Sequence, residues 1–267
     1  MASGSTSPPA KKRLGQHFLV DHNLLGVIGR LAELRRDDVV LEVGPGLGVL
    51  TEYLAERVGL VHAVELDRSL EPHLTAVAQR ANVRLHFEDA LALDLAALEP
   101  SPTKLVANLP YNIATPLVVD SFDTLRTVRL WCVMVQREVA ERFFAQPSTK
   151  AYGAVSVLVQ LSTERIGFHP VSRTVFRPRP SVDSALVAFR RRPLGRGASR
   201  VDARTREVVS AAFAHRRKRL ANSMALAGLA DRERAVTALQ TIGRDAGARA
   251  EELAPEEFIA LAAALGQ

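Results

Sequence analysis

Three glycines, Gly44, Gly46 and Gly48, follow directly on a mostly apolar run over residues 39–43. An apolar run of this length is typical of a strand buried on both faces, as in a parallel sheet covered by helices. Glycine lacks a Cβ atom, so it allows left-handed backbone and lets a ligand approach the main chain closely. The pattern therefore predicts a strand, a tight loop and a helix that continues to about Val58.

The spacing of the glycines separates two classes of cofactor. It is G-x-G-x-G, whereas the dinucleotide-binding fingerprint is G-x-G-x-x-G after a strand. A second apolar run, residues 60–64, ends at Glu65, which lies 21 positions beyond Gly44. A carboxylate there can accept hydrogen bonds from both hydroxyls of a ribose, and a plain strand-to-helix turn would not explain it. The pattern favours S-adenosylmethionine over NAD, with contacts at Gly44, Gly46 and Glu65.

The alternation of strands and helices continues along the chain. Further strands are predicted over residues 83–87, 104–107, 127–136 and 185–189, and helices over 21–34, 69–80, 114–125 and 137–145, while 154–161 suits either. Asp21 is a good N-cap for the first of these helices. The fold class is therefore α/β, with a doubly wound, Rossmann-like sheet of the S-adenosylmethionine methyltransferase kind.

In such a sheet the carboxyl ends of the parallel strands meet at one rim, so Gly44, Glu65 and Asp89 are expected to face the same crevice. Asp89 follows the third strand and can accept a hydrogen bond from the adenine amino group of the cofactor. Capping of the next segment explains Asp89 about as well, and the sequence leaves both roles open.

A second informative site follows the predicted strand over residues 104–107. Asn108 supplies an amide oxygen, Leu109 a main-chain carbonyl, and Pro110 fixes the turn so that Tyr111 can present its ring. Two acceptors beside an aromatic ring suit an exocyclic amino group on a planar base. Asn-x-Pro is often only a turn, but this one follows a strand in a chain that carries the cofactor pattern.

Residues 176–184 are rich in proline, and we interpret them as a loop before the last strand. If this loop reaches the rim, Phe176 could stack on a flipped base opposite Tyr111, while Arg177 and Arg179 meet phosphates. A lone Phe before prolines is more commonly a core residue, so both readings of Phe176 stay open.

Positive charge is concentrated between residues 177 and 219, which hold 13 Arg and Lys against three acidic residues in a chain of net charge +6. Such a patch is the electrostatic footprint of a nucleic-acid binder, or a solubilising surface. Helices are predicted over residues 203–214, 217–226, 231–242 and 255–265. Among them lies the run of RNA-binding candidates Arg216, Arg217, Lys218 and Arg219.

These patterns divide the 267 residues into a disordered basic tail (1–13), a methyltransferase domain (14–193), a linker (194–200) and a helical RNA-binding domain (201–267). No secretory signal and no run long enough to span a membrane is present, so we expect a cytoplasmic protein. Cys132, the only cysteine, has apolar neighbours and is expected in the core. We find no Cys/His cluster suited to a metal, and we expect a monomer.

Taken together, the motifs resemble the small-subunit ribosomal RNA adenine N6,N6-dimethyltransferase family, whose bacterial members are of the KsgA type. The resemblance runs from about Lys12 to the last helices and rests on seven segments in order: residues 14–16, 42–51, 89–91, 108–111, 135–140, 176–184, and 216–218 with Leu220 and Asn222. It implies cofactor contacts at His17, Leu19, Gly44, Glu65, Asp89 and Asn108, and a base site formed by Asn108, Leu109, Tyr111 and Phe176. The family usually has Asn where this chain has His17, so a main-chain contact is the one expected there.

The resemblance also implies the reaction and its partners. The substrate would be two adjacent adenosines in the 3′-terminal hairpin of small-subunit (16S) rRNA, converted to N6,N6-dimethyladenosine on a pre-30S particle during ribosome assembly. Three other functions remain: a large-subunit rRNA adenine methyltransferase of the antibiotic-resistance kind, a non-catalytic assembly or transcription factor with the same fold, and an NAD oxidoreductase. The run Arg216-Arg217-Lys218 with Leu220 and Asn222 favours the small-subunit family over the large-subunit enzyme. Intact Glu65, Asn108 and Tyr111 argue against a non-catalytic factor, and the glycine spacing and the basic second domain argue against an NAD oxidoreductase.

Overall fold

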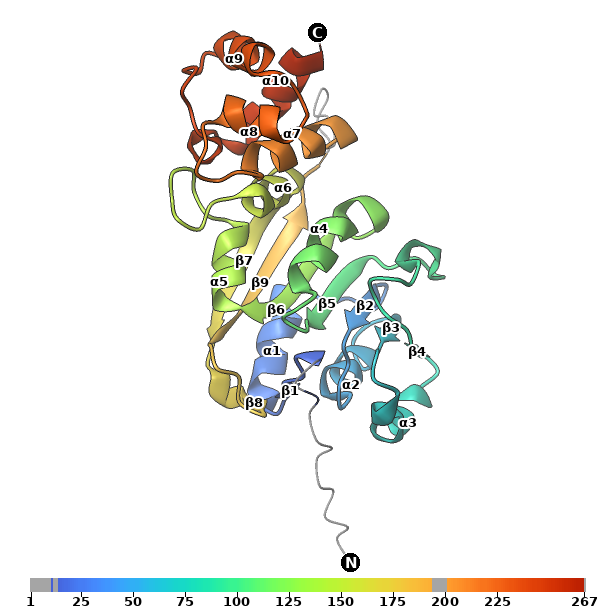
Figure 1. Cartoon of the computed structure of the whole chain (residues 1–267). Helices are drawn as coiled ribbons and strands as arrows, with labels where there is room; N and C mark the ends of the chain where they lie inside the picture. The colour runs from blue at the N-terminus through green and yellow to red at the C-terminus, as the bar shows by residue number, and fades with distance from the viewer. Residues whose placement is uncertain (1–10, 12–13, 194–200, 267) are drawn as a thin grey trace, which may run out of the picture. The chain divides into compact units, whose positions relative to one another are not determined.

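The computed structural model describes Lys11, residues 14–193 and residues 201–266 (Figure 1). The chain forms two compact units, each described here by itself. The first unit comprises the chain up to Arg137 together with Arg165–Arg190, and the second comprises Glu138–Glu164 together with the chain from Arg191 onward. The predicted linker, residues 194–200, lies outside the described residues, as does most of the predicted tail.

In the described part of the chain, seven strands form one sheet in the order β4-β3-β2-β5-β6-β9-β7. Their bounds are β2 Val39–Val43, β3 Leu60–Val64, β4 Val83–His86, β5 Lys104–Asn108, β6 Leu130–Gln136, β7 Thr163–Val171 and β9 Ser184–Arg191. The first five in this order pair in parallel, and β9 pairs antiparallel with β6. The predicted doubly wound sheet is confirmed, and the chain order reverses between β2 and β5.

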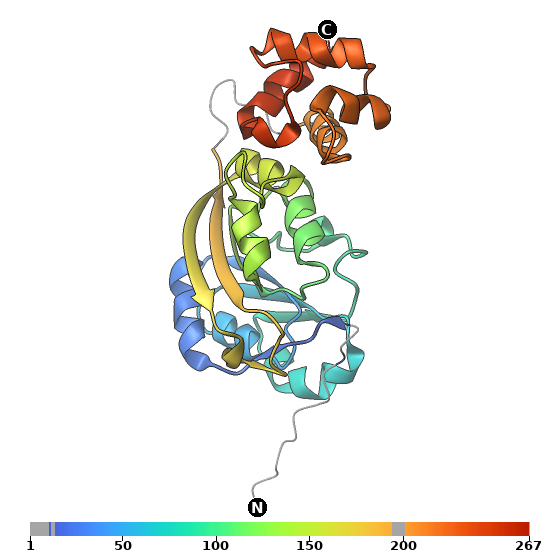
Figure 2. The same ribbon diagram turned by 60° about the vertical axis from the view of Figure 1, so that its left-hand side comes forward.

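Helices cover both faces of this sheet, as Figure 2 shows. They are α1 His22–Leu31, α2 Val49–Ala55, α3 Glu71–Ala78 and α4 Ala114–Thr124. The apolar residues of α1, α2 and α3 share one core with alternate residues of the strands. On α4, Phe122 packs edge-on against Trp131 of β6 at 5.1 Å between ring centroids. Asp21 caps α1 as predicted, accepting from the Asn23 amide at 2.8 Å.

Two features of the first unit differ from the sequence prediction. Residues 176–184 were expected to be a loop, but Phe176–Arg177 form β8, which pairs antiparallel with β1, Phe18–Leu19. Pro178 has no amide hydrogen to continue this pairing, which keeps the ribbon short. Strand β7 was not predicted, because its sequence mixes polar and apolar residues and contains Gly167 and Pro170.

The second unit is helical, with α5 Arg137–Phe143, α6 Ala154–Ser162, α7 Ala203–Phe213, α8 Leu220–Leu226, α9 Arg232–Thr241 and α10 Pro255–Gly266. The four helices predicted after residue 200 are confirmed. Residues 138–164, however, group with them and not with the sheet, which differs from the predicted domain boundary at residue 193. The reason is local packing: the buried Tyr152 donates its hydroxyl to the Leu253 carbonyl at 2.8 Å, and its ring meets Phe213 edge-on.

We expect Tyr152→Phe to lower the free energy of unfolding by about 1–2 kcal/mol, because the Leu253 carbonyl would lose its buried donor. Urea unfolding followed by circular dichroism measures the change. Tyr53→Phe is the matched control, since the Tyr53 ring keeps its stacking with Arg57 of the same helical region. Equal losses in the two variants would contradict the assignment of Tyr152 as a buried tether.

Candidate active site

A cavity of about 170 Å³ opens at the carboxyl ends of β2, β3, β4 and β5. This is where the strand order reverses, the usual ligand position in an open parallel sheet. Predicted site residues gather there from every part of the first half of the chain: His17, Gly44, Gly46, Glu65, Asp89, Asn108, Leu109 and Tyr111 all line the cavity. The crevice predicted from the strand ends is therefore present.

The glycine loop needs its glycines for conformation and for space. Gly44 and Gly46 have φ of +75° and +58°, the left-handed region that side chains rarely adopt. A Cβ on Gly46 would lie 2.9 Å from Cδ1 of Phe18, and one on Gly44 would lie 3.2 Å from Cδ of Pro110. The loop is thus packed between two other segments that line the cavity, and its main chain forms part of the wall.

Glu65 is a buried carboxylate held by the main chain on both oxygens. Its Oε1 accepts from the Asp67 amide at 2.8 Å and its Oε2 accepts from the Gly46 amide at 3.1 Å. Burial raises the pKa of Glu65, while these two hydrogen bonds lower it in part. Each oxygen keeps accepting capacity, so the carboxylate fits the predicted pair of ribose hydroxyls.

Asn108, at the end of β5, has its amide orientation set by the segment before β1. Its Nδ2 donates to the His17 carbonyl at 3.1 Å, so Oδ1 is the group left to accept. Leu109 buries its side chain and donates its amide to the Met134 carbonyl, which leaves its own carbonyl at the turn. The Tyr111 hydroxyl lies 2.7 Å from the Ser184 hydroxyl. Asn108, Leu109 and Tyr111 line the same cavity, and their predicted role as a base site stays a prediction.

His17 differs from the usual family residue, and the structure gives its side chain a partner. Its Nδ1 lies 2.8 Å from the Pro178 carbonyl, an acceptor, so Nδ1 carries the hydrogen and Nε2 of the neutral ring is the acceptor. The ring is 5.4 Å from that of Tyr111. Its main-chain carbonyl accepts from Asn108, and its contact with the cofactor stays a prediction.

Two other predicted cofactor residues lie at the edges of the site. Leu19 is buried in β1 and lines a second cavity of about 30 Å³ with Gly44, Gly46 and Asn108. Asp89 is exposed at the main cavity, and its Oδ1 also accepts from the Leu91 amide at 2.9 Å. Both roles predicted for Asp89, capping and lining the crevice, are therefore compatible with its position.

Phe176 is the predicted site residue that the structure does not bring to either of these cavities. Its side chain is 2% exposed and belongs to the core of the first unit, because pairing of β8 with β1 draws it inward beside Leu19. The reading as a core residue describes this position. Stacking on a base stays a prediction that requires this ring to leave its packing.

Glu42 also lies at the site, although the sequence prediction gave its side chain no role. It lies in β2, is 1% exposed, lines the second cavity, and its Oε2 has no hydrogen-bond partner among the described residues. Burial raises the pKa of Glu42 to about 8. The available signal was a carboxylate in the middle of an otherwise apolar, buried strand.

The raised pKa of Glu42 makes stability depend on pH with a defined sign. Between about pH 4.5 and 8 the folded protein binds a proton that the unfolded chain has released, so the stability from this group is lost as pH rises. We expect Glu42→Gln to gain stability relative to the parent by about 3 kcal/mol between pH 5 and pH 8. Urea unfolding of both proteins at each pH measures this, and parallel pH profiles would contradict it.

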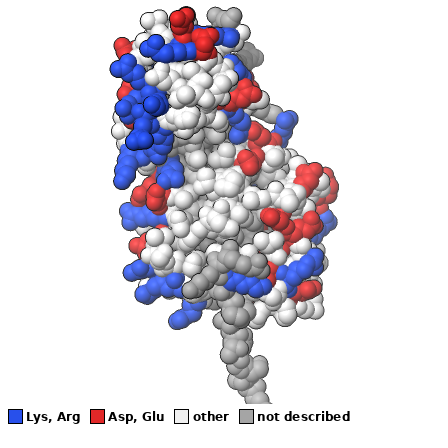
Figure 3. Space-filling model, viewed as in Figure 1, with Lys and Arg blue, Asp and Glu red and all other residues white. Residues whose placement is uncertain are grey.

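The predicted RNA-binding residues are exposed, but they are not equivalent. Arg177 and Arg179 belong to the first unit, next to β8. Arg216, between α7 and α8, donates to the carbonyls of Lys150 and Tyr152 at 3.3 and 3.4 Å, so it also ties the second unit together. Arg217, Lys218 and Arg219 follow it. Figure 3 shows Lys and Arg side chains gathered on one side of the second unit.

The described residues contain no group of three or more His, Cys, Asp or Glu placed to hold a metal ion. They also contain no helix long and apolar enough to cross a membrane. Cys132 is fully buried, as predicted, and burial raises the pKa of its thiol.

Comparison with known proteins adds independent findings. The family model described as ribosomal RNA adenine dimethylase matches residues 9–266. A protein of Rubrobacter xylanophilus named ribosomal RNA small subunit methyltransferase A is 51% identical over 260 residues, which cover 97% of this chain and 96% of that protein. A protein of the same name from Chromobacterium violaceum is 41% identical, covering 94% of each.

Solved structures show the same fold. The crystal structure of a dimethyladenosine transferase from Plasmodium falciparum aligns with a TM-score of 0.75 at 21% identity, covering 92% of this chain and 96% of that one. The crystal structure of the 23S rRNA methyltransferase ErmE aligns with a TM-score of 0.65 at 30% identity, covering 94% of this chain and all of that one. At 21% identity the first likeness concerns the fold alone.

Proposed function

The chain belongs to the ribosomal RNA adenine dimethylase family, an S-adenosylmethionine-dependent class of enzyme, and we propose which adenosines it methylates. The proposed substrate is the pair of adjacent adenosines in the 3′-terminal hairpin of small-subunit (16S) rRNA, each converted to N6,N6-dimethyladenosine. The names of the relatives at 51% and 41% identity support the small subunit as target. We further propose that the protein acts as a cytoplasmic monomer on a pre-30S particle.

The observation that carries the choice of an exocyclic amino group as the methylated group is the orientation of Asn108. Because its Nδ2 is engaged by the His17 carbonyl, its Oδ1 and the Leu109 carbonyl form a pair of acceptors beside the Tyr111 ring. An exocyclic amino group has two hydrogens to donate, whereas a carbonyl oxygen has none. The pair therefore fits adenine N6 and disfavours a keto group at the same place.

The residues around the cavity fit the cofactor. The left-handed glycines at 44 and 46 leave no room for a Cβ, and Glu65 offers both oxygens where a ribose would lie. Bound S-adenosylmethionine supplies an electrophilic methyl group on a sulfonium. Gly44, Gly46, Glu65 and Asp89 would hold it, with His17, Leu19 and Asn108 closing the site beside it.

The chemistry asked of this chain is positioning. The lone pair of adenine N6 is delocalised into the ring, so the amine is a poor nucleophile. When Asn108 and Leu109 each accept one N–H, the nitrogen is favoured in a tetrahedral geometry with its lone pair free for in-line attack. The proton leaves after transfer, when the nitrogen is cationic and acidic, so no strong base has to be built beside Asn108.

One observation favours a second candidate, a large-subunit rRNA adenine methyltransferase. The crystal structure of ErmE, titled a 23S rRNA methyltransferase, shares 30% identity and nearly the whole chain. The two functions share the cofactor and base chemistry, so the sheet does not distinguish them. The higher identities to small-subunit enzymes support the first candidate, and the substrate test separates the two.

The test is transfer of labelled methyl groups to unmethylated small and large ribosomal subunits, followed by digestion to nucleosides. We expect label on the small subunit as N6,N6-dimethyladenosine. Asn108→Ala should reduce the rate by about a hundredfold, because it removes one of the two acceptors. Asn23→Ala, on the exposed side of α1, is the control. Label on the large subunit would retain the chemistry and overturn the proposed substrate.

The basic run between α7 and α8 supports a separate prediction about RNA. Arg217→Ala should weaken binding to the small subunit and reduce the slope of log affinity against log salt by about one, with folding unchanged. Arg216→Ala should also lower stability, because Arg216 binds two carbonyls of the unit. Filter binding over a salt series, with Arg57→Ala as control, measures this, and an unchanged salt slope in Arg217→Ala would count against an RNA contact.

A further inference from the structure

The main cavity has a wall made by the start of the chain. We call Lys11 and residues 14–19 the N-terminal strap, of which Leu14, Gly15, Gln16, His17 and Phe18 line the cavity. The far end of the strap is held in two ways: the His17 carbonyl accepts from Asn108, and Phe18–Leu19 pair with β8. The near end depends on a different set of contacts, which meet at a single side chain.

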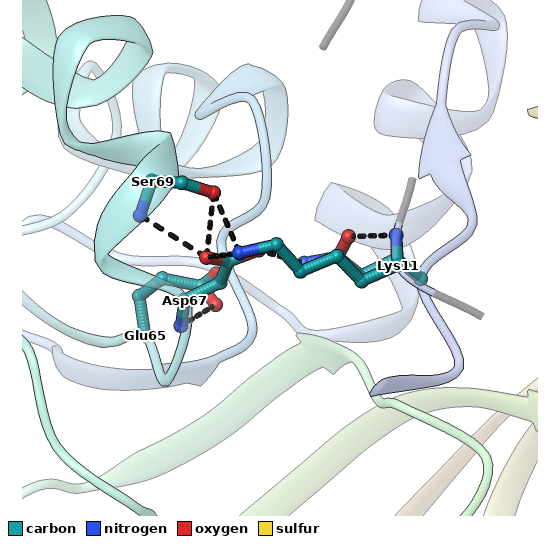
Figure 4. Close-up of polar contacts among 5 residues, drawn as sticks. Lys11, Glu65, Asp67 and Ser69 are labelled. Carbon is teal, nitrogen blue, oxygen red and sulfur yellow. Dashed lines mark hydrogen bonds and ion pairs between the residues drawn. The ribbon is translucent and has the colours of Figure 1, made fainter. Parts of the chain in front are cut away.

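That side chain is Asp67, two residues beyond Glu65 and 5% exposed. Its Oδ1 accepts from Lys11 Nζ at 2.5 Å and from the amide and hydroxyl of Ser69 at 3.0 and 2.7 Å (Figure 4). Its Oδ2 accepts from Gln16 Nε2 at 2.9 Å. Burial alone would raise the pKa of Asp67, but these hydrogen bonds outweigh burial and hold that pKa well below its usual range.

The two strap residues that bind Asp67 are also hydrogen-bonded to each other. The Lys11 amide donates to Gln16 Oε1 at 2.7 Å, so the side chain of Gln16 connects Lys11 with Asp67. Lys11 Nζ also donates to the Ser69 hydroxyl at 2.9 Å. Two strap residues thus reach the same carboxylate by different bonds, which fixes both the position and the direction of the strap at this corner of the cavity.

The main chain of Asp67 makes a second contact at the wall of the cavity. Its amide donates to Glu65 Oε1, and Glu65 is the carboxylate assigned to the ribose. The strap and the ribose acceptor are therefore held by one residue, the side chain holding the first and the amide the second. A substitution that removes the Asp67 side-chain contacts would loosen the strap, but it would leave the hydrogen bond from the amide of residue 67 to Glu65 in place.

We propose that Asp67 is a positioning residue for the cofactor, fixing the N-terminal strap over the cavity through Lys11 and Gln16. The inference rests on the proposed function in taking the cavity ligand to be S-adenosylmethionine. The contacts to Asp67 would hold the strap in place without a ligand, so the ligand would not have to supply the entropy cost of ordering it. A ligand under the strap also leaves only when the strap moves, so the same contacts slow dissociation.

The test is the dissociation constant of S-adenosylhomocysteine, measured by calorimetry on the full chain without RNA. Lys11→Met should raise it about tenfold, and Lys11→Arg, which keeps the charge, should restore most of the affinity. Arg80→Met is the matched control: the Arg80 side chain is 36% exposed against 35% for Lys11, and it pairs with Glu52 at 2.9 Å on α2. Equal dissociation constants for Lys11→Met and Arg80→Met would overturn the proposal.

A double-mutant cycle separates positioning from general loss of structure. Asp67→Ala should weaken cofactor binding, and adding Lys11→Met to it should weaken binding no further, because the carboxylate that Lys11 binds is already gone. Additive effects would overturn the proposal. If Asp67→Ala does not fold, Gln16→Ala tests the proposal instead: it removes the other side chain that binds Asp67, so it should raise the dissociation constant, and an unchanged value would overturn the proposal.

Turnover provides a readout that keeps this inference separate from the proposed function. Lys11→Met should raise KM for the cofactor by about the same factor as it raises the dissociation constant of S-adenosylhomocysteine. A chain that binds the cofactor as expected but labels neither subunit would remove the proposed substrate and leave the role of Asp67 standing. A chain that labels the small subunit while Lys11→Met binds as tightly as the parent would do the reverse.

Discussion

The site depends on the position of Glu65 beside the glycine loop. The parallel register places Val43 of β2 opposite Val64 of β3, so the two strands end level and their following residues meet. Glu65 then accepts from Gly46 across that gap and from Asp67 along its own turn. A shift of one residue in this register would point Glu65 away from the loop, so the site is a consequence of the strand pairing.

Three buried carboxylates near these strand ends show how partners decide charge. Glu42 has an oxygen with no partner among the described residues and a pKa raised to about 8. Glu65 receives two amides, and its pKa is raised, with burial the largest cause. Asp67 receives a lysine, an amide side chain and Ser69, and its pKa is lowered. Glu42, with the fewest donors, has the raised pKa of a neutral acid, and Asp67, with the most donors, has the lowered pKa of an anion.

The sequence alone predicts the strands and the residues at their common rim correctly where residues close together in the chain determine the structure. The runs over 39–43 and 60–64 were predicted with their observed bounds, because a strand buried on both faces is apolar at most of its positions. From them the common rim followed, and with it Gly44, Glu65 and Asn108. What was missed is set by partners far along the chain: β8 forms because β1 lies beside it, and residues 138–164 join the helices through Tyr152. Neither partner can be read from local periodicity.

The N-terminal strap explains how the two halves of the site can act together. Gln16 donates to Asp67, beside the carboxylate that we propose binds the ribose, and the carbonyl of the next residue, His17, accepts from Asn108, one of the two acceptors that we propose for the base. Neighbouring residues of one segment therefore contact both parts of the proposed site. In the proposed reaction, which depends on positioning, a displacement at either end would be transmitted through one peptide unit to the other. On this proposal the strap aligns both reactants, which is more than closure of a cavity requires.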